Sequence, residues 1–252
     1  MEPLISSFFD LPRALFVYYP AMTQSHSAMT PEMRAHCAAV TRRFLHDADI
    51  THLVPYGSGH INDTFRVRLD ENGTSCDYIL QRINTAVFTE PEKMMENIVR
   101  VTGHLQGMCA QEKSVKGFVP LTPVKDASGA WCFADDRGDV WRVYHFVHGT
   151  YAVDVAQSAR QAYEAARLFG HFQELLCGLP APRLHETIRD FHNTAARVRQ
   201  LEVAIARDAA GRVDAVADDI AFARARASLA DTLPPLVASG EIPEREIGRA
   251  HV

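Results

Sequence analysis

The chain has 252 residues, of which 47% are hydrophobic and 23% are charged, and its formal net charge is −5 at pH 7. This composition is typical of a globular protein and excludes a disordered, collagen-like or coiled-coil chain. The negative charge disfavours a protein that holds nucleic acid or an anionic membrane through a positive field.

The cysteines and the apolar runs bear on the cellular compartment. The five cysteines form no Cys-x-x-Cys pair, which predicts reduced thiols and neither a disulfide framework nor a structural zinc site. No apolar run reaches the roughly 20 residues that a bilayer-spanning helix needs. We therefore expect a soluble, cytoplasmic protein with no membrane partner.

Residues 1–28 differ from the rest of the chain. A broken apolar stretch followed by polar residues indicates a disordered or non-native leader, and the true start could be Met1 or Met29. The pattern becomes regular at Thr30, which is a good helix N-cap, and Pro31 suits the first helical position. These residues predict a helix that runs to about Asp47.

The next segment predicts antiparallel strands and one helix. Alternating residues indicate strands over 52–56, 61–69 and 78–83, and the Asn72-Gly73 pair predicts a tight turn between the second and the third. A capping box of Thr89 and Glu92 then begins a helix that we expect to end near Gln106. Further strands are predicted over 119–124, 131–134 and 140–147.

Beyond Gly149 the pattern becomes helical. Helices are predicted over 159–176, 188–207 and 214–233, the last of them ended by Pro234-Pro235. The sequence thus predicts an α+β protein in which a small sheet with one helix is joined to a helical part.

The loop between the first two strands is the first candidate for a binding site. Glycines at 57 and 59 would let backbone amides around Ser58 approach the phosphates of a nucleotide. Directly after them come three hydrogen-bonding side chains that suit a hydroxyl-rich ligand, namely His60, Asn62 and Asp63. The alternative is a flexible hairpin turn.

Two further segments could complete a nucleotide site. Gln81 and Arg82 lie on the third strand, and Glu96 lies on the following helix, where kinase-like folds pair a strand cation with a helix carboxylate. Residues 141–149 lead into the helical part and could offer backbone groups to a nucleotide base. Solvated surface charges and an ordinary linker are the respective alternatives.

Other chemistry is weakly indicated. His145 and His148 have no nearby partner that would complete a metal site, and no Ser-His-Asp elbow or Walker A loop is present. We therefore assign no metal ligand and no catalytic residue from these patterns.

Several short strings, in order, closely resemble the aminoglycoside-phosphotransferase-like kinase superfamily, and within it the N-acetylhexosamine 1-kinase branch. They are YGSGHINDT (56–64), YILQRIN (78–84), MENI (95–98) and WRVY (141–144), followed by FGHFQ (169–173) and FHNT (191–194). The resemblance runs from about residue 52 to residue 245. It implies a bilobal protein-kinase-like fold and transfer of a phosphoryl group from ATP, with magnesium, to a sugar hydroxyl.

The resemblance also implies roles for individual positions. The glycine-containing loop would cover the phosphates, and His60, Asn62 and Asp63 would lie near the junction of nucleotide and sugar. Gln81 takes the place of the usual strand lysine, with Arg82 beside it, so the standard pair with Glu96 is in question. The adenine hinge would consist of Tyr144, His145, Phe146 and Val147.

One departure from the family pattern concerns the last residues. In the family, a segment like 240–245 leads into a His-x-Asp-x-x-x-x-Asn catalytic loop and later into a magnesium-binding Asp, whereas here residues 246–252 follow, which resemble a translated sequencing adapter. We therefore expect a kinase-like N-lobe over 29–148, an incomplete helical C-lobe over 149–245 and an artefactual tail. This chain itself would then be inactive, as a fragment of a sugar kinase. The alternatives are another acceptor, such as an aminoglycoside or choline, and a non-catalytic nucleotide-binding scaffold.

Overall fold

The computed structural model describes residues 29–46, 49–57, 59, 61–71, 73–111, 119–150 and 155–242, and it has the predicted α+β fold. The leader, Ser58, His60 and the tail over 246–252 lie outside the described residues. The sheet comprises β1 (Asp49–Pro55), β2 (Asp63–Glu71), β3 (Thr74–Ile83), β4 (Pro123–Val124), β5 (Phe133–Ala134) and β6 (Val140–His145). The helices are α1 (Pro31–Phe44), α2 (Pro91–Gln111), α3 (Ala159–Leu176), α4 (Thr194–Arg207), α5 (Ala217–Arg224) and α6 (Leu233–Ala238), with 3-10 turns η1 (Asp214–Val216) and η2 (Ala227–Asp231).

The first helix starts where its capping signal predicts. The Thr30 side chain accepts a hydrogen bond of 3.2 Å from the Met33 amide, and Pro31 occupies the first turn. Helix α1 ends at Phe44, three residues earlier than predicted, and buries Cys37, Val40 and Phe44 against the sheet.

The sheet is antiparallel throughout. Its strand order is β1-β2-β3-β6-β4, and β5 also pairs with β6. The predicted alternation of β2 is confirmed, because Phe65, Val67 and Leu69 are buried. Gly73 has a φ of +82°, the left-handed conformation that the predicted turn needs.

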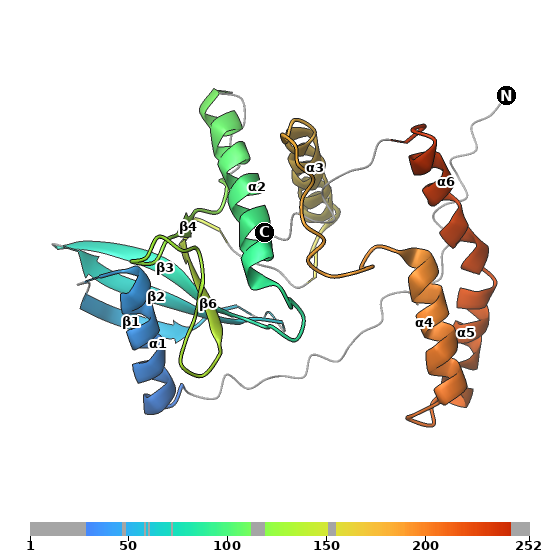
Figure 1. Ribbon diagram of the computed structural model, residues 1–252, viewed down its shortest axis with the longest axis horizontal. Helices are drawn as coiled ribbons and strands as arrows, with labels where there is room; N and C mark the ends of the chain where they lie inside the picture. The colour runs from blue at the N-terminus through green and yellow to red at the C-terminus, as the bar shows by residue number, and fades with distance from the viewer. Residues whose placement is uncertain are drawn as a thin grey trace.

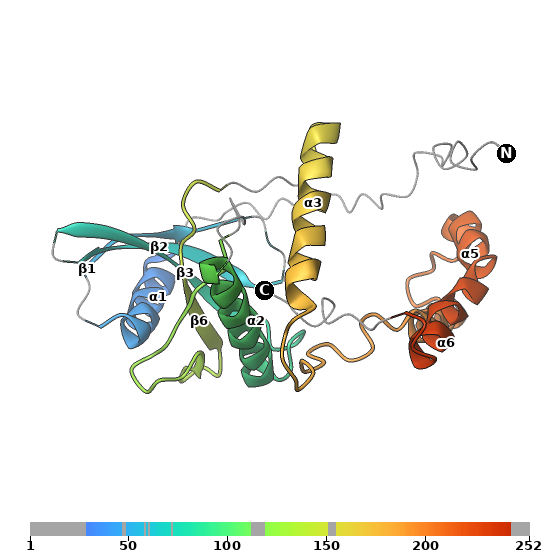
Figure 2. The same ribbon diagram turned by 90° about the horizontal axis from the view of Figure 1, so that it is seen from above.

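The two long helices of the N-terminal half contact opposite faces of the sheet. Since side chains alternate along a strand, Trp141 and Val143 of β6 pack with α1, whereas Val140 and Tyr144 pack with α2. Figures 1 and 2 show both helices beside the sheet. The central strands β3 and β6 therefore have an α1 face and an α2 face.

Helix α3 packs against this unit through its C-terminal part. Leu175 and Leu176 are buried against Val101 and Leu105 of α2, and Phe172 is partly buried against the same cluster. Phe169, one turn earlier in the predicted stripe, is 58% exposed. The stripe thus does not form a continuous buried face.

The last helices correct two predictions. Helix α4 begins at Thr194 and not at 188, because the Asn193 side chain caps it by accepting a 3.0 Å hydrogen bond from the Ala196 amide. The helix predicted over 214–233 is divided into η1, α5 and η2, and Pro234 and Pro235 lie in the first turn of α6. Proline is tolerated in a first turn, where an amide would have no helical partner. Figure 1 shows α4, α5 and α6 grouped away from the sheet.

Two further predictions can be compared with the structure. All five cysteines are free thiols, as expected. Among the described helices, none is both long enough and apolar enough to cross a membrane.

Candidate functional site

A cavity of about 490 Å³ opens on the α2 face of the sheet. Its apolar wall contains Ile79 of β3, Met94 of α2, Leu121 and Tyr144, together with Phe88 from the segment before α2. Its polar groups come from neighbouring strands and the loop before β2. They are Asn62, Gln81 and Arg142.

Six of the predicted site residues line this cavity, although they come from three separate segments of the chain. They are Asn62, Gln81, Tyr144, His145, Phe146 and Val147. The hairpin of β2 and β3 and the pairing of β3 with β6 bring these segments together.

The glycine-containing loop lies at the edge of the cavity. Tyr56 and Asn62, on either side of the loop, both line the cavity, and the Tyr56 amide donates a 2.9 Å hydrogen bond to the Thr64 carbonyl. Gly57 has a φ of +82°, and no other atom lies within 4 Å of the place where a β-carbon would be at Gly57 or Gly59. The positive φ of Gly57 is a conformation that glycine adopts readily, and the space beside both glycines is open.

The polar end of the cavity is built around Arg142. This arginine is only 6% exposed and stands directly opposite Gln81 in the β3–β6 register. Its Nε and Nη2 donate to Gln81 Oε1 at 2.9 and 2.6 Å, while Gln81 Nε2 donates to Thr64 Oγ1 at 2.8 Å. Burial lowers the pKa of Arg142, but an arginine in a protein stays charged.

Tyr144 lies beside this guanidinium. The Arg142 Cζ is 5.0 Å from the centre of the Tyr144 ring, and burial raises the pKa of the tyrosine. The Tyr144 hydroxyl is buried and has no hydrogen-bond partner among the described residues. Such groups are rare in folded proteins and are expected where a ligand or water supplies the partner.

The hinge has fewer available backbone groups than the sequence suggested. The His145 amide donates to the Thr122 carbonyl at 2.9 Å, and the Phe146 amide donates to the Asp77 carbonyl at 3.0 Å. Within the described part of the chain, the Val147 amide is the one of these three that makes no hydrogen bond. A nucleotide base would thus find one backbone amide donor, that of Val147, among these three residues.

The pairing of Arg82 with Glu96, which the sequence left in question, does not form. Alternation along β3 turns Arg82 to the α1 face, where Nε donates to Asp63 Oδ2 at 2.8 Å and Nη1 donates to Asp139 Oδ2 at 3.0 Å. Glu96 lies on an exposed face of α2 and contacts His185 Nε2 at 2.6 Å. Neither side chain lines the cavity.

Asp63 and Asn62 are also engaged within the protein. The Asp63 carboxylate accepts from Arg82, whereas Asn62 Oδ1 accepts a 2.9 Å hydrogen bond from the Asn84 amide. Asn62 therefore reaches the cavity and Asp63 does not, although the two are adjacent in sequence.

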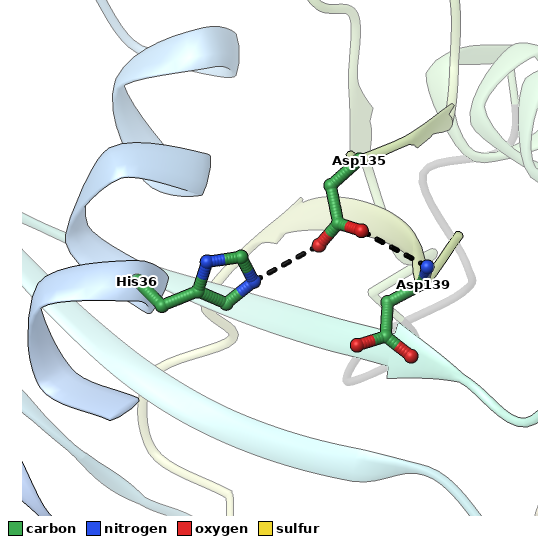
Figure 3. Close-up of side chains that lie close together, drawn as sticks. All are labelled: His36, Asp135 and Asp139. Carbon is green, nitrogen blue, oxygen red and sulfur yellow. Dashed lines mark hydrogen bonds and ion pairs between the residues drawn. The ribbon is translucent and has the colours of Figure 1, made fainter. Parts of the chain in front are cut away.

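A second cluster, of His36, Asp135 and Asp139, has atoms close enough to hold a metal ion (Figure 3). Both Asp135 oxygens already accept hydrogen bonds. Oδ2 accepts from the Trp141 indole at 2.7 Å and contacts His36 Nε2 at 2.9 Å, and Oδ1 accepts from the Arg137 and Asp139 amides. Burial would raise the pKa of Asp135, but these hydrogen bonds hold it below its ordinary value. The cluster is a hydrogen-bonded corner of the α1 face and does not suit magnesium.

The Asp77 carboxylate and two arginines of β2 form an ion-pair network beside Phe146, which lines the cavity. Asp77 accepts from Arg68 Nε at 2.8 Å and from Arg66 Nη2 at 2.6 Å, and the Arg66 guanidinium lies 4.2 Å from the Phe146 ring centre. These arginines hold the pKa of Asp77 well below its usual range despite its burial. The network fixes Phe146 beside Tyr56, with ring centres 5.5 Å apart.

Sequence reasoning missed Arg142 as a site residue. A charged residue inside the otherwise apolar run Val140-Trp141-Arg142-Val143-Tyr144 was a usable signal, because charges are almost never fully buried without a purpose. Tyr56, beside the glycine-containing loop, also lines the cavity.

The comparison with known families covers most of the chain. The model of the phosphotransferase enzyme family matches residues 52–251, a range that includes the cavity, helices α2 to α6 and all of the sheet except the start of β1. Members of such a family are kinase-type enzymes that act on small molecules, generally with ATP and a divalent metal ion. The chain belongs to the phosphotransferase enzyme family.

Proposed function

We propose that the cavity on the α2 face binds ATP and that the protein is a kinase of a sugar hydroxyl. The observation that supports nucleotide binding is the lining of the cavity, which has an apolar wall and a buried, positively charged end. An aromatic base suits the apolar wall, and phosphates suit the cation.

The proposed orientation places the base at the hinge. The Val147 amide would donate to the base, and Ile79, Leu121 and Tyr144 would pack against it. The Gly57–Gly59 loop would then lie on the phosphate side, where its lack of β-carbons leaves space for backbone amides.

The proposed acceptor is an N-acetylhexosamine, and its support is the resemblance of the strings over 56–64 and 78–84. Asn62, together with His60 and Asp63, would approach the sugar. Asp63 would first have to exchange its contact with Arg82 for one with the ligand.

We also propose that the printed chain binds nucleotide without transferring phosphate. Its 252 residues contain no His-x-Asp-x-x-x-x-Asn string, and the one described cluster with metal-like spacing is occupied by hydrogen bonds on the α1 face. In kinases, that string supplies the residue that orients the nucleophile and one of the metal ligands.

Calorimetric titration of the chain with adenosine and with ATP tests the proposal. We expect saturable 1:1 binding of both, and a further rise in thermal stability when N-acetylglucosamine or N-acetylgalactosamine is added to the ATP complex. Stabilisation by choline or an aminoglycoside instead would replace the proposed acceptor. Absence of ATP binding would refute the nucleotide site.

Turnover is measured in parallel. We expect no sugar-dependent ADP release above background from the printed chain with Mg²⁺. ADP release at an enzymatic rate would contradict the proposed inactivity. Nucleotide binding with no effect of any acceptor would favour a non-catalytic scaffold.

A further inference from the structure

The buried guanidinium of Arg142 has no carboxylate partner among the residues that the structure describes. Its Nε and Nη2 contact a neutral amide oxygen of Gln81, and its Nη1 faces only the sulfur atoms of Met95 at 3.6 Å and Met94 at 3.9 Å. Thioether sulfur is a weak acceptor. One side of a permanently charged group therefore lacks a strong partner.

Other arginines of the same sheet show that this arrangement is unusual. Arg66 and Arg68 both pair with Asp77, and Arg82 pairs with Asp63 and Asp139. All three are more exposed than Arg142, with side chains that are 28%, 44% and 34% accessible. The most buried of the four is thus the one without a counter-ion, although burial makes an unpaired charge more costly.

A second unsatisfied group lies at the same place. The Tyr144 hydroxyl is buried without a hydrogen-bond partner, and the Arg142 guanidinium lies over the Tyr144 ring. Both residues line the cavity. Together they offer donors to an anion that enters from the cavity.

We infer that Arg142 binds the phosphate groups of the nucleotide, acting from β6 in place of a strand lysine on β3; this rests on the proposed function. Gln81 then has a different role. By accepting two N–H groups and donating to Thr64, it fixes the guanidinium plane and leaves Nη1 for the ligand, so it is a positioning residue.

The chemistry of the ligand follows from the guanidinium. A planar fork of N–H donors matches the oxygens of a phosphate and binds them by charge-assisted hydrogen bonds. A diphosphate also supplies the negative charge that Arg142 lacks.

The test compares adenosine with ADP in calorimetric titrations of the wild-type chain, Arg142→Met and Arg142→Lys. Arg137→Met is the matched control, because it removes the same charge from an exposed side chain that does not line the cavity. We expect Arg142→Met to bind adenosine like the wild type and to lose about tenfold or more in affinity for ADP. Arg142→Lys should keep part of the ADP affinity, and Arg137→Met should keep the wild-type ratio of the two affinities.

Thermal unfolding of the ligand-free variants is the second measurement. Arg142→Met removes a buried charge that has no described counter-ion but also removes both donors to Gln81 Oε1, so the unfolding temperature should change little. An unchanged ADP-to-adenosine ratio in Arg142→Met would overturn the inference. If Arg142→Met does not fold, an unchanged ADP-to-adenosine ratio in Arg142→Lys overturns it instead.

The two proposals fail in different ways. Wild-type protein that binds neither adenosine nor ADP refutes the nucleotide site and, with it, a nucleotide as the ligand of Arg142. Wild-type protein that binds both, together with Arg142→Met that binds both equally well, refutes only the role of Arg142.

Discussion

Arg82 and Arg142 lie on opposite faces of the β3–β6 pair and differ in their partners. On the α1 face, Arg82 has two carboxylate partners, and Asp135 accepts from Trp141 and His36. On the α2 face, Arg142 has no carboxylate partner among the described residues, and the Tyr144 hydroxyl has no partner there at all. Neighbouring residues of two paired strands therefore differ in their partners as well as in direction.

We propose that this difference separates a stabilising face from a ligand-binding face. A satisfied polar network contributes stability, whereas an unsatisfied one lowers stability until a ligand completes it. The α2 face has a cavity of about 490 Å³. The predictions below alter one face at a time.

The largest effect is expected at Asp135. Asp135→Ala leaves the Trp141 indole, His36 and two backbone amides without their acceptor, so the free energy of unfolding should fall by about 3 kcal/mol. Urea denaturation measures this. Asp136→Ala, at the exposed neighbouring position, should change the free energy by less than about 0.5 kcal/mol. Equal effects of the two changes would mean that the α1 face is not held by this carboxylate.

The next largest effect is expected when a carboxylate is placed beside Arg142. Gln81→Glu places a carboxylate where the guanidinium already donates twice, so the free energy of unfolding should rise by about 1 kcal/mol and ADP should bind about tenfold more weakly. Gln106→Glu, an exposed position on α2, is the matched control and should change neither quantity. Tighter ADP binding by Gln81→Glu would contradict an anion site at Arg142.

Acid should lower the free energy of unfolding by protonating Asp77. The arginines on β2 hold its folded pKa below the unfolded value, so its ion pairs stabilise the protein above about pH 4, and this contribution is lost as the pH falls toward the folded pKa. Urea denaturation between pH 3 and pH 7 should show a steeper loss for the wild type than for Asp77→Asn. Parallel curves for the two proteins would contradict the lowered pKa.

The smallest effect is expected at Tyr144. Tyr144→Phe removes a buried hydroxyl that has no described partner, so the free energy of unfolding should stay within about 0.5 kcal/mol of the wild type or rise. Thermal unfolding without ligand measures this. A loss above about 1 kcal/mol would mean that the hydroxyl is bonded within the protein.

Local signals predicted most of the sheet and the first helix. Thr30 and Pro31 located the start of α1, and the alternation of Phe65, Val67 and Leu69 gave β2 its buried face. Such signals depend on neighbours in sequence, which is why they were readable. The C-terminal helices offer several competing helix starts, and the start that the chain uses decides their bounds. This applies to α4, which is capped by Asn193, and to the helix predicted over 214–233, which is divided.

The site was predictable only in part, because its pieces meet through strand register. Asn62, Gln81 and the hinge were identified from their strings and do line the cavity. The sequence also favoured Arg82 over Arg142, since Arg82 adjoins Gln81 in the chain. The pleat turns Arg82 away, and the register places Arg142 opposite Gln81, sixty-one residues later.

A crystal structure of the protein with bound ADP tests the central claim most directly. We predict the base beside Val147 and a phosphate oxygen within about 3 Å of an Arg142 nitrogen, on the α2 face of the sheet. ADP bound elsewhere, or bound in the cavity with its phosphates directed away from Arg142, would contradict the account.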